Sequence, residues 1–195
     1  TSDCQLGDEV AVSGDLTVTG NENTYTTLTA ASGKRHFKIT SGAHTLRLKW
    51  LNMTGGDVST NWGNGGSIEV NDVAAHLNIS HCVFFNNRAG WGGAIFASDG
   101  QPILFFSFVS FTENNADYYG GAVVLYNGKL VDHSSIYTKN TAGNEGGALY
   151  LYWGSHSSLF DSSLVSNTAG RGGGGIYILG YSSDPSFLNY ILDNI

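Results

Sequence analysis

The stretch FTENNADYYGGAVVLY, residues 111–126, sets an aromatic residue, an Asn, an Ala, a Gly pair and a β-branched run close together. The same order recurs along the chain. The related segments are FFNNRAGWGGAIFA (84–97), YTKNTAGNEGGALYL (137–151), LVSNTAGRGGGGIYI (164–178) and the terminal ILDN (191–194). Their shared Asn residues are Asn87, Asn114, Asn140, Asn167 and Asn194, with steps of 27, 26, 27 and 27 residues. Spacing this even indicates a repeat architecture.

The repeat predicts an all-β fold. No helical stripe of 10 residues or more is present, and short β-branched and aromatic runs alternate with Gly, Asn, Asp and Ser. Three such runs and three turns account for one coil of a parallel β-helix of about 27 residues, whose coils stack at the strand spacing of roughly 4.8 Å. Five to seven coils would make a rod roughly 30 Å long.

Stacking of coils explains why residue types recur. The position three before the Asn predicts an inward apolar ladder of Met53, Phe84, Phe111, Tyr137, Leu164 and Ile191. We expect the Asn column to lie at a turn, bonded to the coils above and below, where its side chain tolerates left-handed backbone geometry. The Gly pairs would permit positive φ at the next corner. These residues are therefore interpreted as scaffold.

The N-terminal part fits the scheme less regularly. LRLKWLNM (46–53) superposes on LNISHCVF (77–84) with a step of 31, and DLTVTG, TYTTLTA and RHFKIT are short alternating strands upstream. We expect a single β-helix domain over 1–195, with irregular coils in 1–45 and regular coils in 46–195. Because the last repeat is cut short, we also expect a fragment of a longer protein or one piece of an end-to-end or lateral assembly.

Charge and composition narrow the function classes. The net charge is −7 with nine Lys and Arg in total, and no basic run appears, which argues against a nucleic-acid partner. No apolar stretch approaches the roughly 20 residues of a membrane span. We expect no cofactor and no metal, because no histidine pair has zinc-site spacing and no phosphate loop is present.

Alternation after the Gly pairs separates an inner from an outer face. Ile68, Ile95, Val123, Leu149 and Ile176 should point inward, as should Val70, Ala97, Leu125, Leu151 and Ile178. The column between them is predicted to face outward and consists of Glu69, Phe96, Val124, Tyr150 and Tyr177. The adjoining column is also predicted to face outward and contains only small residues, Ser67, Ala94, Ala122, Ala148 and Gly175. This strip is either a stabilising stack or a contact surface that another protein subunit or a glycan covers.

Four aromatic residues lie in loops just before the Gly pairs. Trp62, Trp91, Tyr118 and Tyr119 either pack locally or stack on sugar faces. The predicted partner- or glycan-binding set consists of Trp91, Tyr118 and Tyr119 with Phe96, Tyr150 and Tyr177. Ice binding would require regular Thr ranks, which are missing.

Two sequons and two cysteines complete the candidate sites. NMT at Asn52 and NIS at Asn78 match the N-glycosylation signal, and both Asn side chains alternate with inward residues, so both should face outward. Cys82 shares an inward column with Leu51 and Val109. It is either a buried free thiol or paired with Cys4.

The acidic residues offer little for catalysis. Glu113 and Lys139 share a column and predict an exposed ion pair. The nearest catalytic constellation is Asp132 and His133 with Asp161 one coil later, but these Asp residues lie shortly before Ser-Ser in VDHSSIY and FDSSLV and are interpreted as turn residues.

The motif Φ-x-x-N followed by G-G-A-Φ resembles the repeat pair of the chlamydial polymorphic outer-membrane proteins, and GKRHFKITSGAHTLRLKWLNMTGG (33–56) is similar to first coils of secreted right-handed β-helix proteins of bacteria, algae and oomycetes. The resemblance implies a right-handed, pectin-lyase-like β-helix that is secreted or displayed at a cell surface. It leaves two hypotheses: a non-catalytic module for structure, assembly or adhesion, and a polysaccharide lyase or epimerase.

Overall fold

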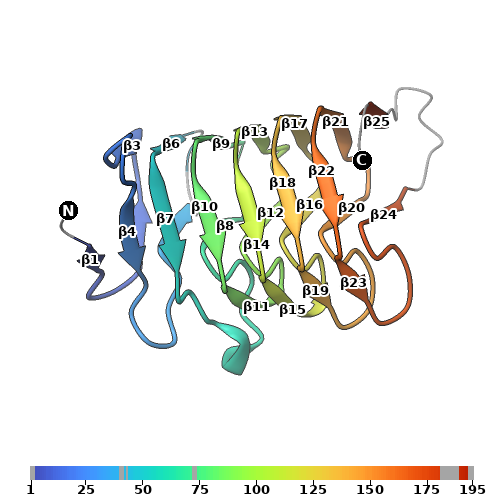
Figure 1. Ribbon diagram of the computed structural model, residues 1–195, viewed down its shortest axis with the longest axis horizontal. Helices are drawn as coiled ribbons and strands as arrows, with labels where there is room; N and C mark the ends of the chain where they lie inside the picture. Colours follow the sequence, from blue (N-terminus) through green and yellow to red (C-terminus); the bar gives the residue numbers. More distant parts are fainter. Residues whose placement is uncertain (1–2, 40–41, 43, 72–73, 181–188, 193–195) are drawn as a thin grey trace.

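The computed structural model is a parallel β-solenoid of about six turns (Figure 1). It describes residues 3–39, 42, 44–71, 74–180 and 189–192. Strands from successive coils lie side by side, and every registered strand pair is parallel, so four sheets run along the rod. Coils of about 27 residues confirm the predicted fold class.

We name the four sheets A to D. Sheet A contains β1 (Cys4–Gln5), β4 (Thr26–Thr29), β7 (Leu51–Thr54), β10 (Val83–Phe85), β14 (Ser110–Thr112), β18 (Ile136–Thr138) and β22 (Ser163–Val165). Sheet B contains β2 (Val10–Val12), β5 (Phe37–Ile39), β8 (Ile68–Asn71), β12 (Ile95–Ser98), β16 (Val123–Tyr126), β20 (Leu149–Tyr152) and β24 (Ile176–Leu179). Sheet C contains β3 (Leu16–Thr19), β6 (Thr45–Lys49), β9 (His76–Ser80), β13 (Ile103–Ser107), β17 (Lys129–His133), β21 (His156–Phe160) and β25 (Asn189–Leu192). Sheet D contains β11 (Arg88–Trp91), β15 (Asn115–Tyr119), β19 (Thr141–Ala142) and β23 (Thr168–Ala169).

The later coils therefore have four strands, and the expectation of three runs per coil is wrong there. Sheet D starts only at β11, and a 3-10 turn, η1 (Ser59–Asn61), precedes it in the preceding coil. The residues after each Asn turn remain extended and pair with the same segment of the next coil, as Ala89 does with Ala116. A short polar segment of this kind has little apolar alternation, so the sequence pattern does not distinguish it from a loop.

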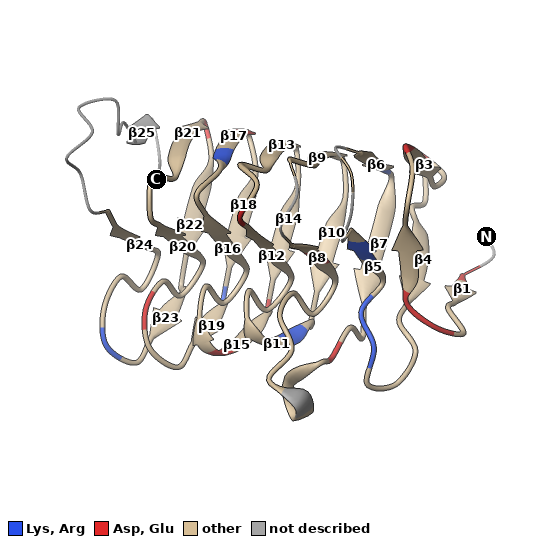
Figure 2. Cartoon of the chain, turned by 180° about the vertical axis from the view of Figure 1, so that it is seen from behind, with Lys and Arg blue, Asp and Glu red and all other residues tan. Residues whose placement is uncertain are grey.

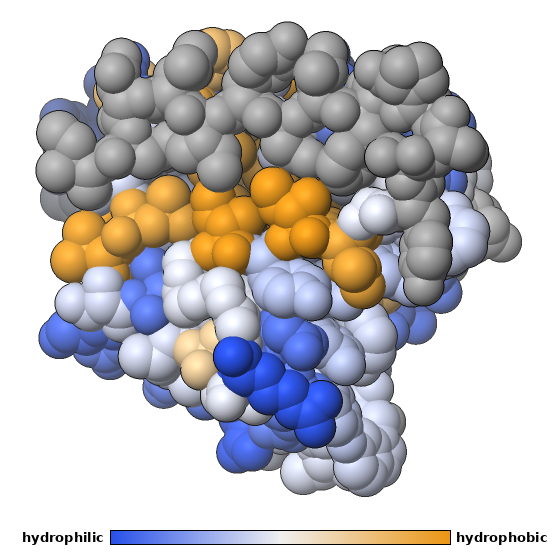
Figure 3. Space-filling view, turned by 90° about the vertical axis from the view of Figure 1, so that its right-hand side faces the viewer, coloured by the Kyte–Doolittle hydropathy of each residue, from blue (hydrophilic) through white to orange (hydrophobic). Residues whose placement is uncertain are grey.

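The core is one continuous cluster along the rod. The predicted ladder holds from Met53 to Tyr137, whose four side chains are fully buried, and the rings of Phe84, Phe111 and Tyr137 stack with centroids 5.0 and 4.9 Å apart. Figure 3 looks onto the C-terminal end of the rod, where an apolar band crosses the surface. There Leu164 and Ile176 are only partly buried, since β22 and β24 are the last described strands of their sheets.

The Asn column forms a buried hydrogen-bond ladder. Each amide Nδ2 of Asn87, Asn114 and Asn140 donates both to a carbonyl of the preceding coil and to Oδ1 of the next Asn, at 2.9–3.1 Å. Each of these residues also donates its backbone N–H to that same Oδ1. Asn167 ends the described ladder, because Asn194 lies outside the described residues. The scaffold interpretation is confirmed for these four residues.

The left-handed residue at this turn is the one before the Asn, which corrects the expectation that the Asn itself takes this geometry. Asn86, Glu113, Lys139 and Ser166 have φ of 53–55°, and Gly55 has 75° in the earlier coil. The Asn must keep its side chain directed along the ladder, so its neighbour makes the turn. Glu113 and Lys139 consequently lie on the surface, with Lys139 Nζ 3.8 Å from Glu113 Oε1, as predicted.

The Gly pairs are required for two different reasons. The first member turns the corner with positive φ, 62° at Gly92 and at Gly120. The second member lies against the next coil, and a Cβ at Gly93 would come 2.2 Å from the carbonyl oxygen of Gly121. Coils can stack at strand spacing only because no side chain projects here.

The predicted fifth copy of the repeat, ILDN (191–194), lies partly outside the described residues. Its Ile191 lies on β25 and pairs with Leu159 of sheet C, so it does not join the sheet A ladder with Leu164. Nine residues (180–188) separate β24 from β25, whereas three separate β20 from β21. Ile191 therefore departs from the predicted apolar ladder, and Asn194 lies outside the described residues.

Candidate functional site

The predicted outward column lies outside the main core but is mostly covered. Phe96, Val124 and Tyr150 are only 8%, 1% and 5% exposed, and they form a second apolar cluster with the half-buried Trp91 and Tyr119 packed on it. The cover includes the rings of Trp91 on β11 and Tyr119 on β15, two strands of sheet D. The prediction of an open apolar strip is therefore wrong. For Phe96, Val124 and Tyr150, at the centre of the column, the interpretation as a stabilising stack holds.

The flanking small column faces the core, which corrects the outward assignment. Ala94, Ala122 and Ala148 are fully buried members of the main cluster. Both Ala94 and Ile95 donate their N–H groups to the same carbonyl, that of Ala122, so strict alternation fails at this corner. Only a small side chain fits where the chain turns into the strand.

The aromatic residues form a connected series of rings, which we call the aromatic face. Tyr119 links Trp91 (centroids 4.5 Å apart) to Tyr150 (4.7 Å), and Tyr150 stacks parallel on Tyr177 at 5.5 Å. The series continues through Tyr152, Tyr126 and Trp153. At its other end Tyr118 joins Tyr119 to Trp62, which is 69% exposed. The structure thus brings together all six predicted binding residues, Phe96, Tyr150, Tyr177, Trp91, Tyr118 and Tyr119.

A shallow hollow of about 350 Å³ opens beside the aromatic face, and we call it the sheet B hollow. Its lining residues are Asn64, Asn71, Trp91, Phe96, Ser98, Asp99 and Tyr126. The Ser98 hydroxyl donates to Asn71 Oδ1 at 3.1 Å, which leaves the amide nitrogen as the remaining donor of that side chain. Amide, carboxylate, hydroxyl and aromatic groups therefore meet in one concave place. Asn64, Asn71 and Asp99 were missed from the sequence, because Asn and Asp beside Gly resemble ordinary turn residues.

The electrostatics of this face differ from one end to the other. Strands β12, β16, β20 and β24 carry no charged residue (Figure 2). At the N-terminal end, buried Glu69 lies 2.6 Å from Arg35 Nη1 and 3.1 Å from Lys38 Nζ. Burial raises the pKa of the Tyr150 phenol, and Tyr119 and Glu145 raise it further. Tyr150 is therefore a neutral hydroxyl at physiological pH.

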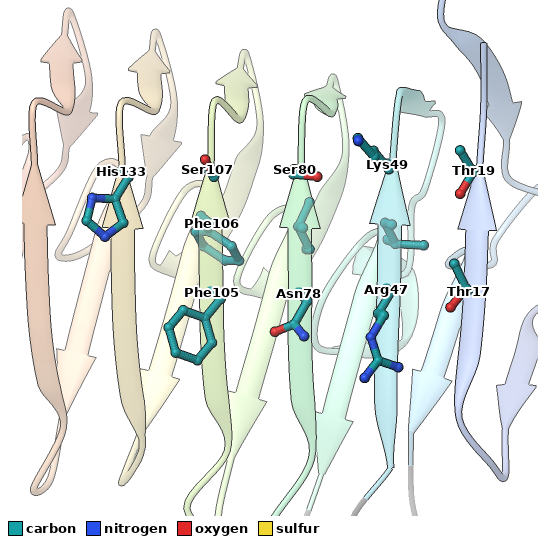
Figure 4. A pocket seen from close by; sticks show the side chains of 12 residues that line it. Thr17, Thr19, Arg47, Lys49, Asn78, Ser80, Phe105, Phe106, Ser107 and His133 are labelled. Atoms are coloured by element: carbon teal, nitrogen blue, oxygen red, sulfur yellow. The ribbon is translucent and has the colours of Figure 1, made fainter. Parts of the chain in front are cut away.

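A second hollow, which we call the sheet C groove, lies on the outer face of sheet C (Figure 4). Its volume is also about 350 Å³, and Arg47, Asn78 and Phe105 project into it side by side from β6, β9 and β13. Phe105 is 43% exposed. The sequence predicted the outward direction of Asn78 but not the groove, although Arg47 and Phe105 occupy the equivalent outward position of their strands.

Aromatic rings also follow the corner after sheet C. Tyr25, Trp50, His81 and Phe108 occupy equivalent positions in four coils, and neighbouring rings lie 4.0–5.8 Å apart. All four have left-handed backbone geometry, with φ of 50–57°. Bulky residues rarely adopt it, so ring stacking here offsets a backbone cost of about 1 kcal/mol per residue.

The constellation on which the enzyme alternative depended is not formed. Asp132 points into the core, fully buried, and accepts a hydrogen bond from the Tyr137 hydroxyl at 2.8 Å. His133, the next residue on β17, therefore faces outward. Burial raises the pKa of Asp132 above its ordinary value. Asp161 is exposed at a corner with φ of 52°, where it serves as a turn residue.

Both cysteines are free. Cys4 is exposed on β1, and Cys82 is buried in the core, where burial raises the pKa of its thiol to about 12. In the register of sheet A, Leu28, Met53 and Phe84 lie beside Cys4 in successive strands. Three strand spacings of roughly 4.8 Å therefore separate Cys4 from β10, the strand that follows Cys82. A disulfide requires Cα atoms within about 7 Å. The free-thiol alternative holds.

Over the part of the chain that the structure describes, no helix has the length and apolarity of a membrane span. Within the same residues, His, Cys, Asp and Glu side chains form no group of three that could hold a metal ion.

Comparison with known proteins supports the repeat. The model of the Chlamydia polymorphic membrane protein repeat matches residues 81–98, which run from the corner residue His81 through Asn87, the first Asn of the ladder, and the Gly92–Gly93 turn to the end of β12. No curated protein and no solved structure matches the chain. The chain is thus a parallel β-solenoid with repeats similar to those of the polymorphic membrane proteins.

Proposed function

We propose that this protein is a non-catalytic extracellular β-solenoid, displayed at a cell surface or in a surface filament, where it serves in adhesion by binding a neutral glycan in the sheet B hollow. The polymorphic membrane protein repeat supports a surface structural role. The observation that carries the proposal is the hollow itself, in which the rings of Trp91 and Tyr126 meet the polar side chains of Asn64, Asn71 and Asp99.

The chemistry of the hollow suits sugars. Aromatic rings offer apolar faces to the C–H groups of a pyranose, and amide and carboxylate groups hydrogen-bond its hydroxyls. No Lys or Arg lines the hollow, and Asp99 does, so an anionic sugar would be repelled. The rigid strands beneath hold the rings in place before a ligand arrives, which lowers the entropic cost of binding.

The test is binding of the folded chain to an array of neutral and acidic glycans, followed by calorimetry on the neutral ligands found. We expect Tyr126→Ala and Asn71→Ala each to weaken binding by tenfold or more, which is about 1.4 kcal/mol. Trp62→Ala is the matched control, because Trp62 is exposed yet does not line the hollow.

The proposal fails if the parent protein binds no neutral glycan at millimolar concentration. It also fails if Trp62→Ala weakens binding as much as the two hollow variants. Circular dichroism on each variant distinguishes lost binding from lost fold.

A further inference from the structure

The two sequons occupy very different surroundings. Asn52 lies on β7 between Thr27 and Val83, and its Oδ1 is buried without a hydrogen-bond partner. Asn78 lies on β9, half-buried, between Arg47 and Phe105 in the sheet C groove. The required hydroxyl residue, Ser80, lines the same groove.

We propose that Asn78 carries an N-linked glycan whose first sugar lies in the sheet C groove, stacked on Phe105, and that Asn52 is not modified. Three features of the groove support this occupant: its position, its volume and its lining.

Position is the first feature. Asn78 and Phe105 are direct register partners on adjacent parallel strands, and both side chains project from the same face (Figure 4). Neighbouring strands lie about 4.8 Å apart, so a ring attached to the Asn78 amide can turn onto the face of Phe105 without any backbone movement. This pairing also gives a use for Phe105, a large apolar side chain that is 43% exposed on a strand.

The volume and the lining of the groove are the second and third features. At about 350 Å³ the groove is at the lower end of the range for small-ligand sites, roughly 300–1,000 Å³, so it admits a sugar ring beside the protein surface. Thr17, Thr19 and Ser107 place hydroxyl groups around it, and Arg47 adds a guanidinium on the other side of Asn78. These groups can hydrogen-bond sugar hydroxyls and the acetamido carbonyl of an N-acetylated sugar.

Asn52 has none of these features. Its column in sheet A continues as Thr27, Val83, Ser110 and Ile136, without an aromatic ring. Neither hollow described above is lined by Asn52. Asn52 is half-buried like Asn78, but a glycan attached there would have no ring in its column to stack on.

The modification itself is a glycosyl transfer from a lipid-linked oligosaccharide diphosphate in the secretory pathway. Asn78 Nδ2 forms a bond to the anomeric carbon of the first sugar. The bond from that carbon to the diphosphate oxygen breaks, and its electron pair leaves with the diphosphate. One proton is lost from the amide nitrogen, and no atom is oxidised or reduced.

The test compares the full chain secreted from a eukaryotic host with the same chain made in a bacterial host that lacks this transferase. Peptide mapping by mass spectrometry should find a glycan on Asn78 and an unmodified Asn52. Thermal unfolding of the two forms should then give a melting temperature about 2–4 °C higher for the glycosylated form, the shift expected for a single additional contact in a chain of this size.

Phe105→Ala tests the stacking directly, since each variant is compared with its own unglycosylated form. We expect this substitution to remove at least half of the shift on glycosylation. Phe108→Ala is the control, because Phe108 is 57% exposed near the end of the same strand but does not line the groove, and it should keep the full shift. An unmodified Asn78, an occupied Asn52, or an equal shift in the Phe105→Ala variant would each overturn the proposal. None of these outcomes bears on binding in the sheet B hollow, which lies on another sheet.

Discussion

Removing one amide from the Asn ladder should destabilise the whole rod. Asn114 is the central test, because its side chain is 1% exposed and makes four hydrogen bonds of 2.9–3.1 Å. In Asn114→Ala, Asn87 Nδ2 keeps its bond to Met53, and Asn140 Oδ1 keeps its bond from the backbone N–H of residue 114. The backbone N–H of Asn87 and the carbonyl of Phe84 lose this partner.

A buried polar group left without a partner costs roughly 1–3 kcal/mol, so two such groups predict a loss of about 2–6 kcal/mol in the free energy of unfolding. For a chain of this length each kcal/mol corresponds to roughly 2–4 °C, which gives a fall of about 4–24 °C in melting temperature. This is a large share of the roughly 5–15 kcal/mol that holds a typical domain folded.

Urea unfolding and calorimetry on the parent, Asn114→Ala and Asn115→Ala provide the measurement. Asn115 is the adjacent residue, half-buried on β15 and outside the ladder, so its truncation should change the free energy of unfolding by no more than about 0.5 kcal/mol. If Asn114→Ala is no less stable than Asn115→Ala, the ladder does not stabilise the stack and the reasoning is refuted.

Four further predictions concern the scaffold. Gly93→Ala should cost about 3 kcal/mol, because its Cβ would lie 2.2 Å from the Gly121 carbonyl oxygen, whereas Gly14→Ala, with open space around the Cβ, should be neutral in the same melts. Cys82 should resist a thiol reagent in the folded protein, because it is buried and the pKa of its thiol is raised to about 12. The folded protein should therefore show one reactive thiol per chain, that of Cys4, and the protein in denaturant should show two. Burial lowers the pKa of His36 from 6.5 to about 4, so the unfolded chain binds the proton first as the pH falls. The free energy of unfolding should therefore fall by about 2–3 kcal/mol between pH 6.5 and 4.5. The His36→Gln variant should show a flatter pH dependence of the urea midpoint. Burial raises the pKa of Asp132, so its contribution to stability is full at low pH and is lost as the pH rises through the pKa of the folded state. The Asp132→Asn variant should therefore be more stable than the parent at pH 7. A less stable variant would contradict this account.

The periodic residues were predictable because each one recurs for a reason confined to its own column. Asn87 and Gly93 meet the same neighbours as Asn114 and Gly121 one coil later, so a 27-residue period alone identifies them as scaffold. The same logic placed Cys82 in the core between Leu51 and Val109. It failed at Ala94, where strict alternation breaks at the corner, and at Ile191, which pairs in sheet C and not in sheet A.

The exposure of surface side chains and the position of the hollows could not be predicted from the repeat period. Whether Phe96 and Tyr150 are exposed depends on rings such as Trp91 and Tyr119, which come from sheet D, a different part of each coil. Asp132 was interpreted as a turn residue because Ser134 and Ser135 follow closely, but it lies on β17 with its side chain buried. The hollows required coordinates, because each gathers residues from several coils, such as Asn64, Trp91 and Tyr126.

The sequence by itself determined the winding of this chain: repetition of Asn, Gly and apolar residues at equal intervals specifies contacts between equivalent positions, and those contacts are the coil stack. Tertiary structure decided what the winding exposes. Cover arises between non-equivalent positions, such as Phe96 beneath Trp91, and a periodic pattern carries no information about pairs of that kind.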